Sequence, residues 1–430
     1  MALFLGSFHS GFAQGEMSLQ EMINTALEQN YQIRIFANSN QAAQNANTIG
    51  NAGMLPDVDL TGEYRVSMNN TEQKYFTGDG QSADNAKSTV LTGNVGVNWV
   101  VFDGLGMFAR KSQLEHLEKL SEQDLRYYIE QTAYDIAFNY YRLVQEQKLL
   151  KLFRKSVEVS ESRLEFENQA FNVGSATALD VQQALVDRNT DSSMVLEQKA
   201  LIKEIEIELN RIINRDLIAP IQLVDSIRLK GDFDLMNLME ASRNNNAELN
   251  RQQLTELASI SNYKIAQGDL YPVVELFGNY GYNRQDNEVG FLESSRQFGP
   301  NAGVRIRFNL FTGGRDNIRA KNMKLESESE AFRTDDLKRE VEGSVRVSYI
   351  RWSSRLEQVQ LEMQSVEAAQ KALTIAWKQF EVGTLTNVDF RIIQLNAVNA
   401  QSRLLTAQFA AKARELELNR LSGTLLESVF

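Results

Sequence analysis

The chain has 430 residues, of which 43% are apolar, and carries a formal net charge of -11 at pH 7. Acidic and basic residues are interspersed along it, which argues against a nucleic-acid-binding surface. Cysteine is absent and the only histidines are His9 and His116, so disulfides, thiol catalysis and cysteine-ligated metal are excluded. No window approaches the ~18 consecutive apolar residues of a transmembrane helix. Any membrane span would therefore have to be built from strands.

The N-terminal segment, 1–14, is apolar and rich in small residues but lacks a basic leader. Its end, Gly11–Ala13, fits the small-x-small pattern of a signal-peptide cleavage site. We interpret the segment as the remnant of a secretory signal, which implies an exported protein that begins near Gln14 or Gly15. A cloned or frayed N-terminus is the alternative that these residues leave open.

An internal duplication organises the rest of the chain. The phrase FNVGSATALDV at Phe171–Val181 returns 209 residues later as FEVGTLTNVDF at Phe380–Phe390. Self-similarity of this kind is the mark of a repeated structural unit. We therefore predict two repeats of one architecture, at 15–219 and 234–430, joined by a linker at 220–233.

Each repeat is dominated by residues with high helix propensity. From Ile129 to Leu143 the apolar residues follow the 4-3-4-3 spacing of a packed helix. An uninterrupted helix after Gly104 would be about 105 Å long at 1.5 Å per residue, far longer than a bilayer is thick. The predicted helices are 17–54, 104–173 and 176–215 in the first repeat and 234–270, 313–382 and 385–423 in the second. A structural rod of exposed coiled-coil helices stays open as an alternative.

Short segments that alternate between apolar and polar residues precede each long helix. We predict β-hairpin strands at about 56–67, 91–102, 272–283 and 302–311. One face of each strand would be apolar and the other charged, as in a transmembrane barrel with a wet lumen, although a soluble half-buried hairpin would show the same alternation. The charged side chains assigned to the barrel lumen are Asp57, Asp59, Glu63, Arg305 and Arg307.

The number of strands decides how such a barrel could close. One chain supplies four predicted strands, whereas the smallest membrane barrels have about eight and are filled by side chains. Two copies would leave no room for a charged channel, and three copies would give twelve strands. The predicted fold class is therefore mainly α with a small β part: a long α-helical coiled-coil barrel plus a transmembrane β-barrel shared between three protomers.

Together these features resemble the TolC-like outer membrane efflux proteins, or outer membrane factors, over essentially the whole chain from Met17 to Leu426. The resemblance rests on the duplicated unit, the long helix after Phe-x-Gly, the segment LPDVDLTGEY and the paired turns VGSATALDV and VGTLTNVDF. It implies a homotrimer in the outer membrane of a Gram-negative bacterium, with the helical part in the periplasm. It also implies two partners, a periplasmic adaptor (membrane fusion) protein and an inner-membrane transporter of the RND or ABC type.

The function implied by the resemblance is a passive exit duct of a tripartite efflux or type I secretion system. The sequence contains no complete phosphate loop and no convergent acidic cluster. We therefore expect no enzyme activity, no cofactor, no bound metal and no nucleic-acid partner. A rod-like coiled-coil structural or adhesion protein of the cell envelope is the alternative from a different functional class.

The duplicated phrase is predicted to form the turn of each helical hairpin. Gly174 and Gly383 can take the positive φ of a helix C-terminal cap, and a following serine or threonine can cap the next helix. In the family this closed end docks the adaptor. We assign docking to Val173, Gly174, Ser175 and Thr177 in the first turn and to Val382, Gly383, Thr384 and Thr386 in the second.

Asp180 and Asp389 follow these turns, just inside the returning helices. A carboxylate is favourable near any helix N-terminus, so simple helix-dipole chemistry could account for both. In a trimer, however, three copies of each would form an acidic ring at the narrowest point and favour cations. We therefore assign both residues to the periplasmic gate.

The gate departs from the family pattern. Some members latch the closed tip with a tyrosine and an arginine in the second turn and carry another acid one helical turn after the aspartate. The matching positions here are Phe380, Leu385 and Ile392, so those hydrogen bonds cannot form. We expect apolar packing of these three side chains with Phe171 to hold the tip closed.

Overall fold

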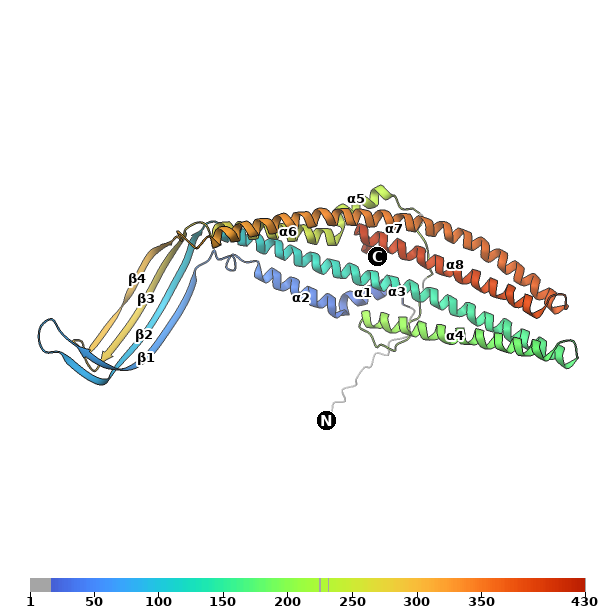
Figure 1. Ribbon diagram of the computed structural model, residues 1–430, viewed down its shortest axis with the longest axis horizontal. Coiled ribbons are helices and arrows are strands. Elements are labelled where there is room, and N and C mark those ends of the chain that lie inside the picture. Colours follow the sequence, from blue (N-terminus) through green and yellow to red (C-terminus); the bar gives the residue numbers. More distant parts are fainter. Residues whose placement is uncertain (1–16, 224–225, 231, 430) are drawn as a thin grey trace, which may run out of the picture. The chain divides into compact units, whose positions relative to one another are not determined.

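The computed structural model describes residues 17–223, 226–230 and 232–429, so the predicted signal remnant at 1–14 lies outside the described residues. Each repeat contains two helices, a β-hairpin and two further helices in this order (Figure 1). The elements of the first repeat are α1 (Leu19–Gln29), α2 (Tyr31–Ala46), β1 (Asp57–Gln73), β2 (Gln81–Asp103), α3 (Gly106–Asn172) and α4 (Ala178–Ile212). Those of the second are α5 (Leu235–Asn245), α6 (Ala247–Gly268), β3 (Val273–Asn287), β4 (Ser294–Arg307), α7 (Arg315–Glu381) and α8 (Asn387–Ser422), followed by α9 (Leu425–Val429).

The chain divides into two compact units, each built from both repeats. The first unit contains the described residues up to Asn38 together with 123–251 and 335–429, and it is helical. The second contains 39–122 and 252–334, which include the whole β-sheet and the helical segments that flank it. The long helices α3 and α7 have 67 residues each, or about 100 Å at 1.5 Å per residue, and each runs through both units.

The first helix of each repeat is interrupted, which the sequence analysis did not predict. The segments predicted as single helices at 17–54 and 234–270 are broken at Asn30 and Asn246, whose ψ angles of 125° and 117° are extended. The reason is local capping, because each asparagine side chain accepts a backbone N–H of the helix that follows. Each also donates to the end of a returning helix, Asn30 to the carbonyl of Ile212 at 2.7 Å and Asn246 to that of Leu421 at 3.0 Å.

The main core of the first unit lies between α1, α3 and α4. The periodic apolar residues of α3 are buried from Ala133 to Leu143, and Met22 of α1 and Leu209 of α4 pack in the same cluster and are fully buried. Burial of one large aliphatic side chain stabilises a fold by roughly 1.5–3 kcal/mol. This cluster therefore holds the helices of the first repeat together.

The strands form one antiparallel sheet in the order β1-β2-β3-β4, with bounds that differ from the predicted ones. β1, β2 and β3 run past the predicted ends at 67, 91 and 283, because polar residues also complete backbone hydrogen bonds across a hairpin. β4 begins at Ser294 and ends at Arg307, short of the predicted 311. Its partner β3 begins at Val273, opposite Arg307, so 308–311 have no β3 residue to pair with.

Candidate functional site

The two predicted turns close the α3–α4 and α7–α8 hairpins with the same backbone geometry. Gly174 and Gly383 have φ angles of 80° and 73°, in the left-handed region that glycine adopts without steric cost. The next residues, Ser175 and Thr384, donate their backbone N–H groups to carbonyls five residues earlier, at 2.8 and 2.9 Å. This pattern ends each long helix in a Schellman motif.

Threonine and aspartate side chains start the returning helices. In the first turn the Thr177 N–H donates to the Asp180 carboxylate at 2.9 Å, and the Asp180 N–H donates to the Thr177 hydroxyl at 3.3 Å, which is a capping box. Hydrogen bonds from the Thr177 side chain and backbone hold the pKa of Asp180 below its ordinary value. In the second turn the Asp389 N–H donates to the Thr386 hydroxyl at 3.2 Å. Both aspartates thus have a local role, and the acidic ring stays a prediction.

The four apolar side chains expected to plug the tip do not form one cluster within the chain. Phe380 is 4% exposed, and its ring packs on Phe166 of α3 with a centroid distance of 4.9 Å. Leu385 packs against the same cluster. Phe171 and Ile392 are 48% and 52% exposed. The observed cluster therefore joins the two hairpins inside one chain, and of these four side chains Phe171 and Ile392 are left exposed for contacts between chains.

A buried ionic cluster next to this apolar cluster was missed by the sequence analysis. Arg391 of α8 donates two hydrogen bonds to the Asp191 carboxylate of α4, both at 2.9 Å, and its Nε lies 3.7 Å from Asp187. Arg163 of α3, with a fully buried side chain, pairs with Asp187. The four charges sum to zero. They connect both hairpins by geometry that arginine forms better than lysine.

Neutral polar groups complete this cluster around Asp191. The Ser156 hydroxyl donates to the Asp191 carboxylate at 3.0 Å, and the Ser160 hydroxyl donates to it as well. Burial raises the pKa of Asp191, but the hydrogen bonds from Arg391 and Ser160 and the charge of Arg391 outweigh burial, so the pKa lies below its usual value. Gln394 donates to Ser160 at 3.1 Å. Asp191 is therefore held ionised in the interior.

One sequence signal could have revealed this ionic cluster. At the repeat offset of 209 residues, Arg163, Asp187, Asp191 and Arg391 correspond to Ala372, Asn396, Ala400 and Gln182. Each charge thus replaces an uncharged residue of the other repeat. Asp187 and Asp191 are charged residues at helical spacing that occur in one repeat only. Such residues indicate a role that the fold shared by the two repeats does not require.

The register of the sheet separates its side chains into an apolar and a polar face. Residues directly opposite each other share a face, so Leu60, Val95, Tyr280 and Pro300 form one row of the apolar face. The neighbouring row, on the polar face, contains Asp59, Gly96, Asn279 and Asn301. The predicted lumen residues all lie on this polar face, namely Asp57, Asp59, Glu63, Arg305 and Arg307. Exposed valine, leucine and tyrosine side chains cover the other face.

The two open edges of the sheet carry opposite charges on the polar face. β1 contributes Asp57 and Asp59, and β4 contributes Arg305 and Arg307. Arg305 donates to Glu275 of β3 at 2.9 Å. Among the described residues, Asp57, Asp59 and Arg307 have no ion-pair partner. Gly303 of β4 lies in the same row as Asp57 of β1 and is two residues from Arg305. The aspartates of β1 and the arginines of β4 therefore lie at the same end of the sheet.

The part of the chain that the structure describes contains neither a cluster of metal ligands nor a helix that could span a membrane. There, no group of three or more histidine, aspartate or glutamate side chains is arranged to hold a metal ion. None of the described helices has an apolar stretch long enough to cross a membrane.

The sequence profile of the outer membrane efflux protein family matches residues 22–215 and 238–424, one match for each repeat. The chain belongs to the outer membrane efflux protein family. Outer membrane protein TolC of Vibrio cholerae is 23% identical over 415 residues, which cover 95% of this chain and 91% of TolC. The probable efflux pump outer membrane protein TtgC of Pseudomonas putida is 22% identical over 436 residues and covers 94% of this chain and 83% of TtgC.

The fold of this outer membrane efflux protein is similar to solved outer-membrane channels. The CmeC channel of Campylobacter jejuni superposes with a TM-score of 0.82 at 14% sequence identity, over 95% of this chain and 86% of CmeC. The mainly α fold with a small β part and the internal duplication are confirmed, and the sharing of one barrel between three protomers stays a prediction. The outer-membrane location with a periplasmic helical part and the role as a passive channel rather than an enzyme are also confirmed.

Proposed function

We propose that three copies of this chain form the exit duct of a tripartite efflux or type I secretion system, open to substrates delivered by an inner-membrane transporter of the RND or ABC type through a periplasmic adaptor. The observation that carries the proposal is the four-stranded sheet with an exposed apolar face, a charged face and two unpaired edges. Four strands cannot enclose a channel, and an open edge in a membrane leaves backbone groups unsatisfied. Pairing of β4 with β1 of the next copy removes every edge.

Charge complementarity supports this order of assembly. In a closed ring, Arg305 and Arg307 of one copy would face Asp57, Asp59 and Glu63 of the next across the new strand pair. Cross-strand pairs of opposite charge are favourable, and like charges placed opposite each other are unfavourable. The pairing would also give Asp57, Asp59 and Arg307 the ion-pair partners that they lack among the described residues of one chain.

Charge reversal at one edge tests the assembly. We expect the protein to be extracted from outer membranes as a trimer and to conduct ions in planar bilayers. Arg305→Glu combined with Arg307→Glu should reduce the trimer fraction, because each like-charged pair costs up to roughly 1 kcal/mol at each junction. Adding Asp57→Arg and Asp59→Arg should restore it.

Mass in detergent is the readout for this test. A wild-type protein with the mass of one chain, 48.7 kDa, would refute the trimeric duct. Reversal without loss of trimer, or without rescue by the swapped charges, would refute the edge pairing alone.

We assign adaptor docking to the turns at the tip. Val173 and Val382 occupy equivalent positions in the two repeats and are 80% and 73% exposed, although valine is usually buried. The Asn387 side chain donates to the backbone carbonyl of Asp180 at 3.3 Å, which links the two turns. A trimer would thus present six linked turns with exposed apolar side chains, a surface suited to a protein partner.

The acidic ring of the gate is tested by ion selectivity. Asp180→Asn combined with Asp389→Asn should lower the preference for cations in planar-bilayer recordings, most clearly at low salt where charges are least screened. Trimer formation should persist, because the asparagine side chain keeps an acceptor oxygen for the cap. Unchanged selectivity would assign both aspartates to helix capping alone.

A further inference from the structure

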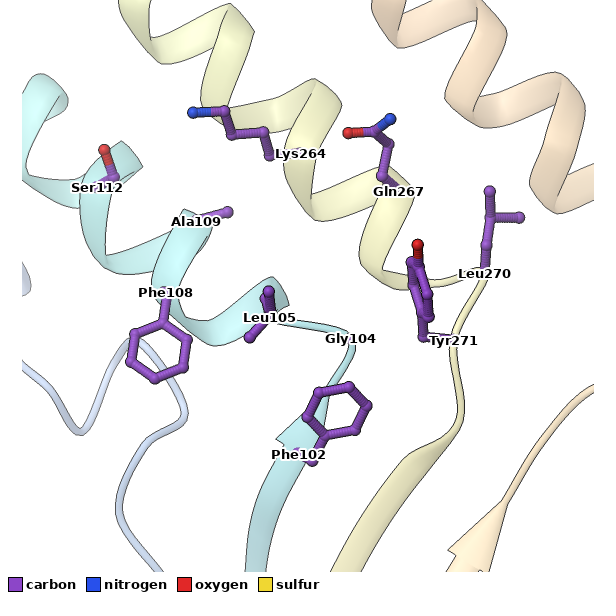
Figure 2. Close-up of a pocket in the computed structure, with 10 residues that line it drawn as sticks. All are labelled: Phe102, Gly104, Leu105, Phe108, Ala109, Ser112, Lys264, Gln267, Leu270 and Tyr271. Atoms are coloured by element: carbon purple, nitrogen blue, oxygen red, sulfur yellow. The ribbon is translucent and has the colours of Figure 1, made fainter.

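A pocket of about 620 Å³ lies in the second unit, where β2 turns into α3 and α6 ends. Most of its lining is apolar, and Figure 2 shows Phe102, Leu105 and Phe108 on the α3 side and Tyr271 on the α6 side. Leu105 and Phe108 are 62% and 60% exposed. The volume of the pocket lies within the range found for ligand-binding sites.

The backbone at the rim is strained in a way that the fold does not require. Leu105 has φ of 69°, a left-handed conformation that residues with a Cβ atom adopt at a cost. The matching residue of the second repeat is Gly314, with φ of 80°, and the residue matching Phe108 is Asn317. The turn can therefore be built with glycine. A strained apolar residue that the duplicate lacks points to a role in binding.

The pocket continues the apolar face of the sheet. Phe102 lies opposite Val274, and Val274 lies opposite Ile306, so Phe102 shares the face that carries the exposed apolar side chains. Trp99, on the same face, is 41% exposed. Aromatic residues at the end of an apolar strand face mark the border between hydrocarbon and headgroups. The pocket therefore lies where an acyl chain meets its headgroup.

The other end of the pocket is cationic. Lys264 reaches from α6 toward the turn of α3 that carries Ser112 (Figure 2), and no carboxylate among the described residues pairs with it. His116 and Lys119 follow Ser112 on the same face of α3. Burial and the charges of Lys119 and Lys264 hold the pKa of His116 below its ordinary value. The nearby carboxylate of Glu115 is occupied by Lys111 at 2.7 Å.

We propose that this pocket binds one phospholipid of the periplasmic leaflet for each chain, with an acyl chain against Leu105 and Phe108 and the phosphate at Lys264. The proposal rests on the membrane placement of the sheet in the proposed function. A lysine ammonium is a suitable partner for phosphate oxygens. Without this charge, the apolar groove could bind any hydrocarbon, so Lys264 is the feature that favours a phospholipid.

The test uses the full-length protein reconstituted in nanodiscs of phosphatidylglycerol and phosphatidylethanolamine and released for native mass spectrometry. We expect bound phospholipid on the wild-type trimer. Lys264→Glu should reduce the retained lipid roughly tenfold, as expected for loss of one well-placed contact with a charged group. Leu105→Gly should reduce it by a similar factor, because it removes the apolar contact of one large aliphatic side chain with the acyl chain. Leu105→Gly should fold, because Gly314 occupies the matching turn.

Lys321→Glu is the matched control, because Lys321 corresponds to Ser112 in the second repeat but does not line the pocket. It should retain lipid as the wild type does. Full lipid retention by both pocket variants overturns the proposal. A second result also overturns it: the wild type retains no phospholipid, but the delipidated protein binds inorganic phosphate and loses this binding when Lys264 is replaced. Failure of the proposed function is seen separately, as a wild-type protein that is monomeric or does not enter nanodiscs.

Discussion

Replacing Asp191 with alanine is expected to destabilise the joined α3–α4 and α7–α8 hairpins by roughly 3–5 kcal/mol, because it leaves Arg391 buried without its bidentate partner. The Arg391 side chain is 10% exposed and that of Asp191 is 2% exposed, so water cannot compensate for the loss. Hydrogen exchange of the backbone amides of α4 and α8 measures the opening free energy of this region. Bilayer recordings should show more frequent opening of the tip if the hairpins hold it closed.

Two controls separate the ion pair from general damage. Asp191→Leu combined with Arg391→Met removes both charges and should stay within about 1–2 kcal/mol of the wild type, since no lone charge remains. Glu367→Ala breaks an ion pair whose two side chains are 69% and 72% exposed and should cost less than about 1 kcal/mol. Equal protection in Asp191→Ala and the wild type would show that the buried pair does not hold the hairpins together.

Acid should act on the same ion pair. The pKa of Asp191 is lowered in the folded state, so its contribution to stability is present above its unfolded pKa, about 3.9. That contribution is lost as the pH falls through the lower, folded pKa. Exchange protection in the wild type should therefore decrease below about pH 4. The variant with leucine and methionine should show a weaker dependence on pH in this range.

Placing a lysine at Val95 is expected to cost roughly 2–4 kcal/mol per chain, because the apolar face of the sheet would contact lipid near mid-membrane. Val95 is 47% exposed and lies in the interior of β2, opposite Leu60 and Tyr280. The cost should fall to about 0–1 kcal/mol for Ile306→Lys, since Ile306 is one residue from the end of β4. Folding into lipid vesicles, followed by denaturant titration, measures both.

Asn94→Lys is the matched control for the face assignment. Asn94 adjoins Val95 in β2 but lies on the polar face, opposite Thr61 and Gly281. A lysine there would extend into the wet lumen and should be tolerated. A higher cost at position 94 than at position 95 would show that the two faces have been assigned the wrong way round, and equal costs would show that they do not face different surroundings.

Much of this architecture could be predicted because its signals are local. The turns depend on Gly174 and Gly383 and on the threonine and aspartate that follow each, and these residues cap helices through bonds within a few positions of the chain. Alternation of side chains along a strand is likewise a property of the backbone. The polar face containing Asp57 and Arg305 could therefore be recognised before any contact between strands was known.

The ends of the strands and helices required more than local pattern. β4 ends at Arg307 because β3 supplies no partner beyond Val273, although the alternation of side chains continues to residue 310. The first helix of each repeat breaks at Asn30 or Asn246, whose side chains bond helix ends far away in the sequence. A short stretch of sequence around either asparagine does not contain the carbonyl group that it bonds.

The sequence by itself determined the duplication, the two faces of the sheet and the capped turns of this outer membrane efflux protein, since each depends on neighbours in the chain. Only the tertiary structure decided that Phe380 packs inside the chain and that Asp191 meets Arg391, 200 residues away. It alone brought Leu105 and Lys264 to one pocket. The physical reason is that burial and ion pairing depend on which helices lie side by side, which periodicity along one helix does not specify.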